Sequence, residues 1–208
     1  MTSAMTFRSF QIATFAILFL VSVFAIDTVA QDDNNLTKGT IGVEVGLWKP
    51  SSIDDNPSKP FTNVKGADPY IGLNFTSPFF KDYAIRVTLL QWQQKELSNR
   101  IEWESVTLRH LSADLINSIF IGSTMPFVSF GLAIIWSREV PVGSEEKKAP
   151  LDRAGYGANV GAGIGLQLTG HIGVMAEYQY LYAKFAKKVG LTDNYSGPKL
   201  SLKFLYIF

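Results

Sequence analysis

Apolar residues alternate with polar residues or glycine along much of this sequence, and this period of two is typical of β-strands with two different faces. The clearest stretch is 156–168, where the residues between the apolar ones are Gly157, Asn159, Gly161, Gly163, Gly165 and Gln167. Such segments occur at 40–48, 71–76, 83–92, 101–113, 127–136, 156–168, 172–180 and 199–208. The pattern predicts an all-β chain of eight antiparallel strands.

The connections between these segments alternate between long polar stretches and shorter ones. The long ones include 50–66, 138–153 and 183–196, whereas residues 169–171 join two segments as a hairpin. Residues 114–124 fit this scheme least well, because they are longer and more apolar than a tight turn. An even number of strands with alternating short and long connections is typical of an up-and-down transmembrane β-barrel, with both ends of the barrel on the side of the short turns.

A soluble β-sandwich would share the period of two, so two further features decide between the alternatives. Aromatic residues stand toward strand ends, as in the girdles of membrane barrels, at Trp48, Tyr83, Trp136, Tyr156 and Tyr206. The opposite faces are rich in glycine, as expected where eight strands leave a narrow interior. Both features favour the membrane barrel.

The first thirty residues have the layout of a secretory signal peptide. Arg8 precedes an apolar run over 12–26, and the small-residue site 28–30 stands before Gln31. A transmembrane helix is the alternative, but the run is shorter than the roughly 20 residues that span a bilayer, and Asp27 follows it at once. We therefore predict a signal peptide at 1–30 and a single barrel domain at 31–208.

Composition excludes several classes of function. The 19 basic and 18 acidic side chains nearly cancel, so no basic field is present that would attract nucleic acid. The chain has no cysteine and two histidines, which excludes a disulfide framework and leaves no cluster for a transition metal. The alternating glycines at 161–165 lack the following helix that a nucleotide-binding loop requires. We predict no metal and no cofactor.

The sequence combines the eight segments and the signal peptide with an aromatic C-terminus and a hairpin that contains Gly161-Ala162-Gly163 and Glu177-Tyr178-Gln179-Tyr180. Together these features resemble the small outer-membrane β-barrel family of the OmpA membrane domain, OmpX and OmpW type. The resemblance implies a place in the outer membrane of a Gram-negative bacterium, among lipid and lipopolysaccharide. It also implies that the last strand is a signal read by the barrel-assembly machinery. The residues of that signal are Leu202, Phe204, Tyr206 and Phe208.

Charged residues on the inward faces are the main candidates for a functional site. By the alternation, these inward charges are Glu44, Arg86, Arg109, Glu177 and Lys203. An unpaired charge inside a narrow barrel would be costly, so we predict that they form ion pairs that fill the lumen. The alternative is a gate in a narrow pore, in which the same pairs exchange partners.

His110 and Ser112 lie two residues apart, as in the His-x-Ser of outer-membrane lipid A deacylases of the PagL type, which this short stretch weakly resembles. The predicted register turns both side chains toward lipid near the periplasmic end, whereas lipid A occupies the outer leaflet. A hydrolase also needs an acid that orients the base, and none follows at a suitable spacing. We interpret the pair as an interfacial histidine and a strand-end serine.

The sequence as a whole predicts a non-enzymatic outer-membrane barrel with a structural or surface-interaction role and a lumen filled by side chains. A narrow channel for small or apolar solutes is the alternative, as the OmpW resemblance suggests. A lipid-modifying hydrolase is a remote third. The loops are the predicted variable part, and the sequence indicates no particular extracellular ligand.

Overall fold

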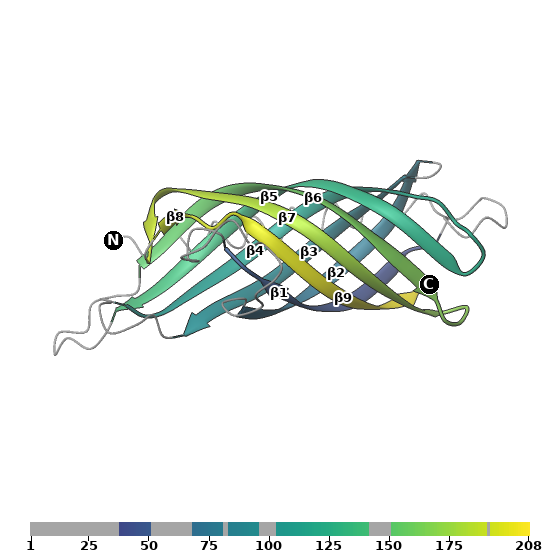
Figure 1. Cartoon of the computed structure of the whole chain (residues 1–208), viewed down its shortest axis with the longest axis horizontal. Helices are drawn as coiled ribbons and strands as arrows, with labels where there is room; N and C mark the ends of the chain where they lie inside the picture. The colour runs from purple at the N-terminus through teal and green to yellow at the C-terminus, as the bar shows by residue number, and fades with distance from the viewer. Residues whose placement is uncertain (1–37, 51–67, 81–82, 96–102, 142–150, 191) are drawn as a thin grey trace. The chain divides into compact units, whose positions relative to one another are not determined.

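The computed structural model describes residues 38–50, 68–80, 83–95, 103–141, 151–190 and 192–208. Nine strands form one antiparallel sheet, and eight of them are long enough to act as barrel staves (Figure 1). Their bounds are β1 Thr40–Trp48, β2 Asp68–Phe80, β3 Tyr83–Lys95, β4 Trp103–Ser118, β5 Thr124–Pro141, β6 Leu151–Gln167, β7 Ile172–Val189, β8 Thr192–Asn194 and β9 Gly197–Ile207. Within the described residues, no helix is long and apolar enough to cross a membrane.

The sheet closes on itself. Each strand from β1 to β7 pairs with the next, and β9 pairs with both β7 and β1. The three-residue β8 pairs with β7 beyond the end of β9, so it extends the eighth stave. The predicted eight-stranded antiparallel barrel is thereby confirmed. Closure leaves no unpaired edge among the staves, which is what a sheet in lipid requires.

The two ends of the barrel differ in their connections. Residues 81–82, 119–123 and 168–171 join strands at one end, here called the turn end, and the longer connections join them at the other, the loop end. Both termini of the barrel lie at the turn end, because the Phe208 amide donates to the Gly39 carbonyl at 3.0 Å. The Ile207 amide likewise donates to the His171 carbonyl of the β6–β7 turn at 2.9 Å.

Several strands are longer than the sequence predicts. β4 continues to Ser118, so the stretch 114–118 that was predicted to lie outside the strands is part of one. β7 continues to Val189, and β5 and β6 extend into the predicted loop 138–153. The predicted signal peptide, residues 1–30, and most of the predicted loop 50–66 lie outside the described residues.

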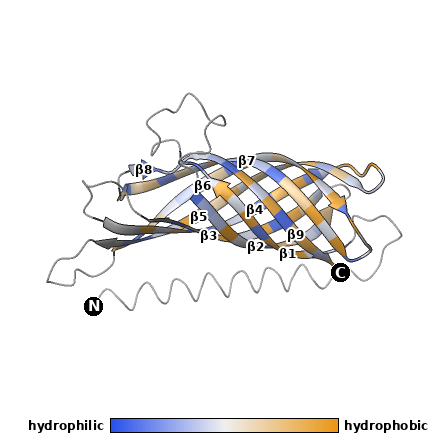
Figure 2. Ribbon diagram, turned by 60° about the horizontal axis from the view of Figure 1, so that its bottom comes forward, coloured by the Kyte–Doolittle hydropathy of each residue, from blue (hydrophilic) through white to orange (hydrophobic). Residues whose placement is uncertain are grey.

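The extensions of β5, β6 and β7 at the loop end share a physical cause, which is a reversal of the hydropathy pattern. In the middle of β7, Glu177 points inward and Tyr178 outward, but farther toward the loop end Leu181 points inward and Lys184 outward. On β3, Arg86 is likewise buried in the middle, whereas Leu90 and Trp92 are buried toward the loop end. Figure 2 shows how apolar (orange) and polar (blue) residues alternate along the strands.

The reversal divides the barrel into two zones. From the turn end to the level of Trp136, Tyr156 and Tyr182, the outside is apolar and the middle of the lumen is polar. Beyond that level, the outside is polar and the inside is a packed apolar core. On β7, the apolar outer stretch from Ile172 to Tyr182 matches the roughly 9–11 residues of a membrane-spanning β-strand.

Candidate functional site

The middle of the lumen holds a charge network of three cations and three carboxylates. All six are buried, and they come from strands β1, β3, β4, β7 and β9. The network comprises Glu44, Arg86, Asp114, Glu177, Lys199 and Lys203. Its formal charges cancel, which lowers the cost of removing them from water.

Arg86 lies at the centre of this network. Its Nη2 donates to Glu177 Oε1 at 2.8 Å and to Asp114 Oδ2 at 3.0 Å, and its Nε donates to Asp114 Oδ2 at 3.2 Å. The Asn159 amide donates to the other Asp114 oxygen at 2.9 Å, and the Ser129 hydroxyl donates to Glu177 Oε1 at 2.6 Å. Each of the two carboxylates therefore accepts hydrogen bonds from a cationic donor and from a neutral donor.

Lys203 links this centre to the opposite side of the network. Its Nζ contacts Glu177 Oε2 and lies 3.4 Å from Glu44 Oε2. The Tyr70 hydroxyl donates to Glu44 Oε1 at 2.6 Å. Lys199 lies 5.0 Å above the Tyr70 ring, and its Nζ donates to Gln179 Oε1 at 3.0 Å. Each formal charge thus has at least one hydrogen-bonding or ionic partner.

Glycine on the inner face makes room for these long side chains. A Cβ added to Gly131 would collide with Asp114 Oδ1 and lie 2.6 Å from the Ala113 carbonyl oxygen. A Cβ added to Gly46 would lie 2.6 Å from the Tyr70 ring. The glycine-rich inner faces noted in the sequence therefore provide the space that the network occupies.

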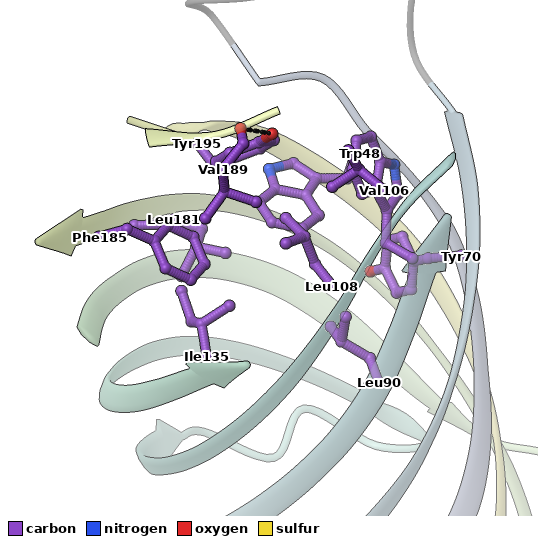
Figure 3. Packing of buried hydrophobic residues seen from close by; sticks show 12 residues of the cluster. Trp48, Tyr70, Leu90, Val106, Leu108, Ile135, Leu181, Phe185, Val189 and Tyr195 are labelled. Carbon is purple, nitrogen blue, oxygen red and sulfur yellow. Dashed lines mark hydrogen bonds between the residues drawn. The ribbon is translucent and has the colours of Figure 1, made fainter. Parts of the chain in front are cut away.

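An apolar cluster lies inside the barrel at the loop end. This upper cluster packs inside the strands and is drawn in Figure 3. Its members are Trp48, Tyr70, Leu90, Trp92, Val106, Leu108, Ile135, Leu181, Ala183, Phe185, Val189 and Tyr195. Ring contacts join Trp48 to Trp92 with centroids 5.2 Å apart, Trp92 to Tyr195 at 6.1 Å and Phe185 to Tyr195 at 5.8 Å.

Hydrogen bonds hold the segment that follows β7 against this cluster. The Tyr195 hydroxyl donates to the Val189 carbonyl at 2.7 Å. The buried Glu139 of β5 accepts from the Gly190 amide at 3.0 Å, and its other oxygen lies 3.2 Å from Arg153 Nε of β6. Gly190 has a φ of 57°, in the left-handed region that favours glycine. Three strands are thus tied together at the loop end of the lumen.

A smaller apolar layer lies on the other side of the charge network. This lower cluster, at the turn end, consists of Ile116, Phe127, Met175 and Leu205. Ala84 and Met125 pack against it and are partly buried. The charge network therefore lies between two apolar layers.

The structure brings together four of the five charges predicted to face inward, namely Glu44, Arg86, Glu177 and Lys203. The fifth prediction is wrong, because Arg109 is exposed on the outside, where its Nε donates to Gln91 Oε1 at 3.2 Å. The cause is the reversed pattern on β4. An inward Arg109 would turn Val106 and Leu108 outward, but both are buried in the upper cluster. Trp48, assigned to an outer girdle, is also fully buried there.

The same register error affects His110 and Ser112. Both point inward, with exposures of 0% and 2%, and do not face lipid as predicted. Among the described residues, neither ring nitrogen of His110 has a hydrogen-bond partner, so His110 and Ser112 do not form the base–nucleophile contact that an ester hydrolase requires. The geometry gives no support to a lipid hydrolase at this pair.

Sequence reasoning missed Asp114, Tyr70, Asn159 and Lys199 as members or partners of the network. Asp114 could have been found, since His110, Ser112, Asp114 and Ser118 continue one polar face along β4. The residues of the predicted C-terminal signal, Leu202, Phe204, Tyr206 and Phe208, all point outward and are exposed. No group of His, Asp or Glu within the described parts of the chain has the arrangement of a metal site.

The sequence matches no family model and no curated protein. Solved structures are similar in fold. Neisserial surface protein A aligns over 82% of this chain and 96% of its own, with a TM-score of 0.56 and 14% identity. The outer membrane protein OprG from Pseudomonas aeruginosa aligns over 82% and 95%, with a TM-score of 0.52 and 14% identity. The outer membrane enzyme PagL aligns over 78% and 97%, with a TM-score of 0.48 and 10% identity.

Proposed function

We propose that this chain, which has the fold of the small eight-stranded outer-membrane β-barrels, is a non-enzymatic outer-membrane protein with a structural or surface-interaction role. The proposal rests on the buried side chains inside the barrel. The charge network occupies the middle, and apolar clusters lie on both sides of it. An ion that crossed this interior would have to displace buried ion pairs and packed aromatic rings, and both displacements are costly.

The apolar outside supports a place in the membrane. Ile71, Leu73, Phe130, Leu132 and Phe204 are each more than half exposed, and a soluble protein rarely exposes so large a continuous apolar surface. Paired strands without a free edge fit the hydrocarbon core, where every backbone polar group needs a partner. We infer that the turn end faces the periplasm and the loop end the outside, as in bacterial barrels with short periplasmic turns.

A narrow channel for small solutes is the second candidate. It is favoured by Asn74 and His110, which are buried and whose side chains have no hydrogen-bond partner among the described residues. A polar solute or water could satisfy such groups. For conduction, however, the upper cluster would have to open.

Single-channel recording in a planar bilayer tests the two candidates. The refolded protein is compared with a Trp48→Ala/Trp92→Ala variant, which removes two rings from the upper cluster, and with Glu177→Gln, which weakens the charge network. We expect the wild-type protein to be silent at any holding potential. Heat-modifiable migration on gels confirms that folded barrel is present in each sample.

Discrete openings of the wild-type protein would contradict the filled lumen, and a change in their conductance in Glu177→Gln would establish the channel. Openings confined to the double tryptophan variant would support the proposal, because they would identify the upper cluster as the seal.

A further inference from the structure

We propose that one side of the barrel binds the phosphate groups of a multiply phosphorylated membrane lipid. The site is a basic rim of four exposed side chains, Arg109 on β4, Arg138 on β5, and Lys184 and Lys188 on β7. The inference rests on the proposed membrane location, since it assigns the rim to the level of the lipid headgroups.

The position of the rim follows from the strand register. Arg109 pairs across β4 and β5 with Trp136, and Lys184 pairs across β6 and β7 with Tyr156. Cross-strand partners point to the same face with Cβ atoms about 4.5–5.5 Å apart. Tyr182 precedes Lys184 by two residues on that same outer face. Aromatic residues of this kind mark the membrane–water interface, so the adjoining cations lie at headgroup level.

The rim occupies only part of the barrel circumference. On β1, β2 and β3, the described residues that face outward nearest this level are uncharged, namely Leu47, Pro69 and Gln91. Two acids lie beside the rim: Asp152 on β6, which pairs across the strands with Arg138, and Asp193 on β8, the strand that pairs with the end of β7. Among the described residues, basic side chains therefore outnumber acidic ones on the outer face of the strands from β4 to β8.

The four cations are available to a ligand. Within the described residues, none of them forms an ion pair, and Arg109 donates to the neutral Gln91 amide oxygen. Arg153, by contrast, is committed to the buried Glu139. Guanidinium and ammonium groups without an acidic partner are suited to bind phosphate oxygens.

The chemistry of the neighbouring surface selects a lipid over a soluble polyanion. Directly below the cations lies the apolar band, with Ile134, Tyr156 and Tyr180 on adjoining strands, each more than a third exposed. Acyl chains would cover this band while phosphates contact the rim. Because the cations are spread over three strands, a headgroup with two phosphates can satisfy more of them than a headgroup with one.

Native mass spectrometry of the full mature protein in detergent measures the affinity directly. The probe is diphosphoryl lipid A, with phosphatidylcholine of matched chain length as the uncharged reference and inorganic pyrophosphate as a soluble competitor. The test variant is R109Q/R138Q/K184Q/K188Q. Two controls accompany it: the charge-preserving R109K/R138K/K184R/K188R, and Lys38→Gln, which removes an exposed cation that is not part of the rim.

A basic residue at a membrane surface contributes roughly a fivefold change in affinity. We therefore expect the fourfold glutamine variant to bind diphosphoryl lipid A at least ~20-fold more weakly, while both controls stay within about threefold of wild type. Equal affinity of the glutamine variant and wild type would overturn the proposal. Complete displacement of the lipid by equimolar pyrophosphate would overturn the assignment to a lipid.

The proposed membrane location is checked separately in the same preparations. Failure of the wild-type protein to fold into phosphatidylcholine vesicles, seen as unchanged gel migration after heating, would contradict that location and this inference together. Normal folding into vesicles without any preference for the phosphorylated lipid would overturn this inference alone.

Discussion

Arg86 and Glu177 meet at 2.8 Å inside the barrel, although 91 residues separate them along the chain. Their strands, β3 and β7, are separated by three staves in the sheet order on one side and by three on the other, so they are opposite walls. The ion pair therefore crosses the lumen. It joins distant staves directly, whereas the backbone ladder joins only neighbours.

Removing one partner of this pair should destabilise the barrel. In Glu177→Ala, the Arg86 guanidinium keeps Asp114 but loses its second carboxylate, and Lys203 keeps Glu44 at 3.4 Å and the Ser201 hydroxyl at 2.9 Å. Breaking a buried pair typically costs about 3–5 kcal/mol. Urea unfolding in lipid vesicles measures the free energy of unfolding, with the exposed Lys187→Ala as control. A loss no larger than that of the control would show that the network does not support the fold.

Gly131 provides a second test, because its missing side chain makes room for Asp114. In Gly131→Val, the new Cβ would overlap Asp114 Oδ1 and displace it from Arg86 and Asn159. Overpacking of this kind costs typically about 1–3 kcal/mol, and the broken hydrogen bonds add to it. Gly170→Ala is the matched control, since nothing lies within 4 Å of its added Cβ. Equal unfolding midpoints for the two variants would contradict this role.

The sequence predicted the fold well in the zone with an apolar outside and poorly beyond it. Strand β1 was predicted with the bounds that the structure has, and the inward positions of Glu44, Arg86, Glu177 and Lys203 followed from simple alternation. These predictions follow from a single rule, which assigns apolar side chains to the outside of the barrel. The rule holds only where the outside is apolar, so it could not apply to the loop end, where the outside is polar and the inside is packed.

The wrong prediction for Arg109 shows why the side-chain directions at the loop end could not be predicted from the sequence. On β4, the polar residues Arg109 and Thr107 face outward and Leu108 faces inward, but Ser112 and Asp114 face inward in the same strand. Because charge alone does not indicate the face, assigning the register requires knowing at which residue the pattern reverses. That residue is fixed by pairing with β3 and β5, which is information that one segment does not contain.

The reversal itself can be tested on neighbouring positions of β4. Leu108 is fully buried in the upper cluster, whereas Thr107 points outward beyond the apolar band. Leu108→Lys places a charge in an apolar core, so we expect a loss of several kcal/mol or failure to fold. Thr107→Lys should change stability by about 0.5 kcal/mol or less. Thermal unfolding followed by gel migration ranks the two variants, and the opposite ranking would invalidate the assigned register.

Tyr195 should make the loop end sensitive to alkali. Burial, together with the nearby negative charge of Glu139, raises the pKa of the Tyr195 phenol well above its ordinary value of about 10. Below pH ~10 the phenol is neutral in both states and its contribution is complete. As the pH rises above that value, the unfolded phenol ionises first and the free energy of unfolding falls. Tyr195→Phe should lose less stability between pH 9 and pH 11, and parallel curves for the two proteins would refute this expectation.

Deleting Phe208 tests the predicted assembly signal, because the deletion should affect recognition by the barrel-assembly machinery more than the stability of the folded barrel. Its amide donates to the Gly39 carbonyl at 3.0 Å, and its exposed ring stacks on Phe75 with centroids 6.2 Å apart. Deleting Phe208 removes one backbone hydrogen bond, worth about 0.5–1.5 kcal/mol, so spontaneous refolding into vesicles should remain efficient. We expect folding assisted by the barrel-assembly machinery to slow severalfold, with Phe208→Tyr behaving like wild type. Folding time courses in vesicles with and without the machinery make the comparison, and an assisted rate unchanged by the deletion would argue against recognition of the terminal ring.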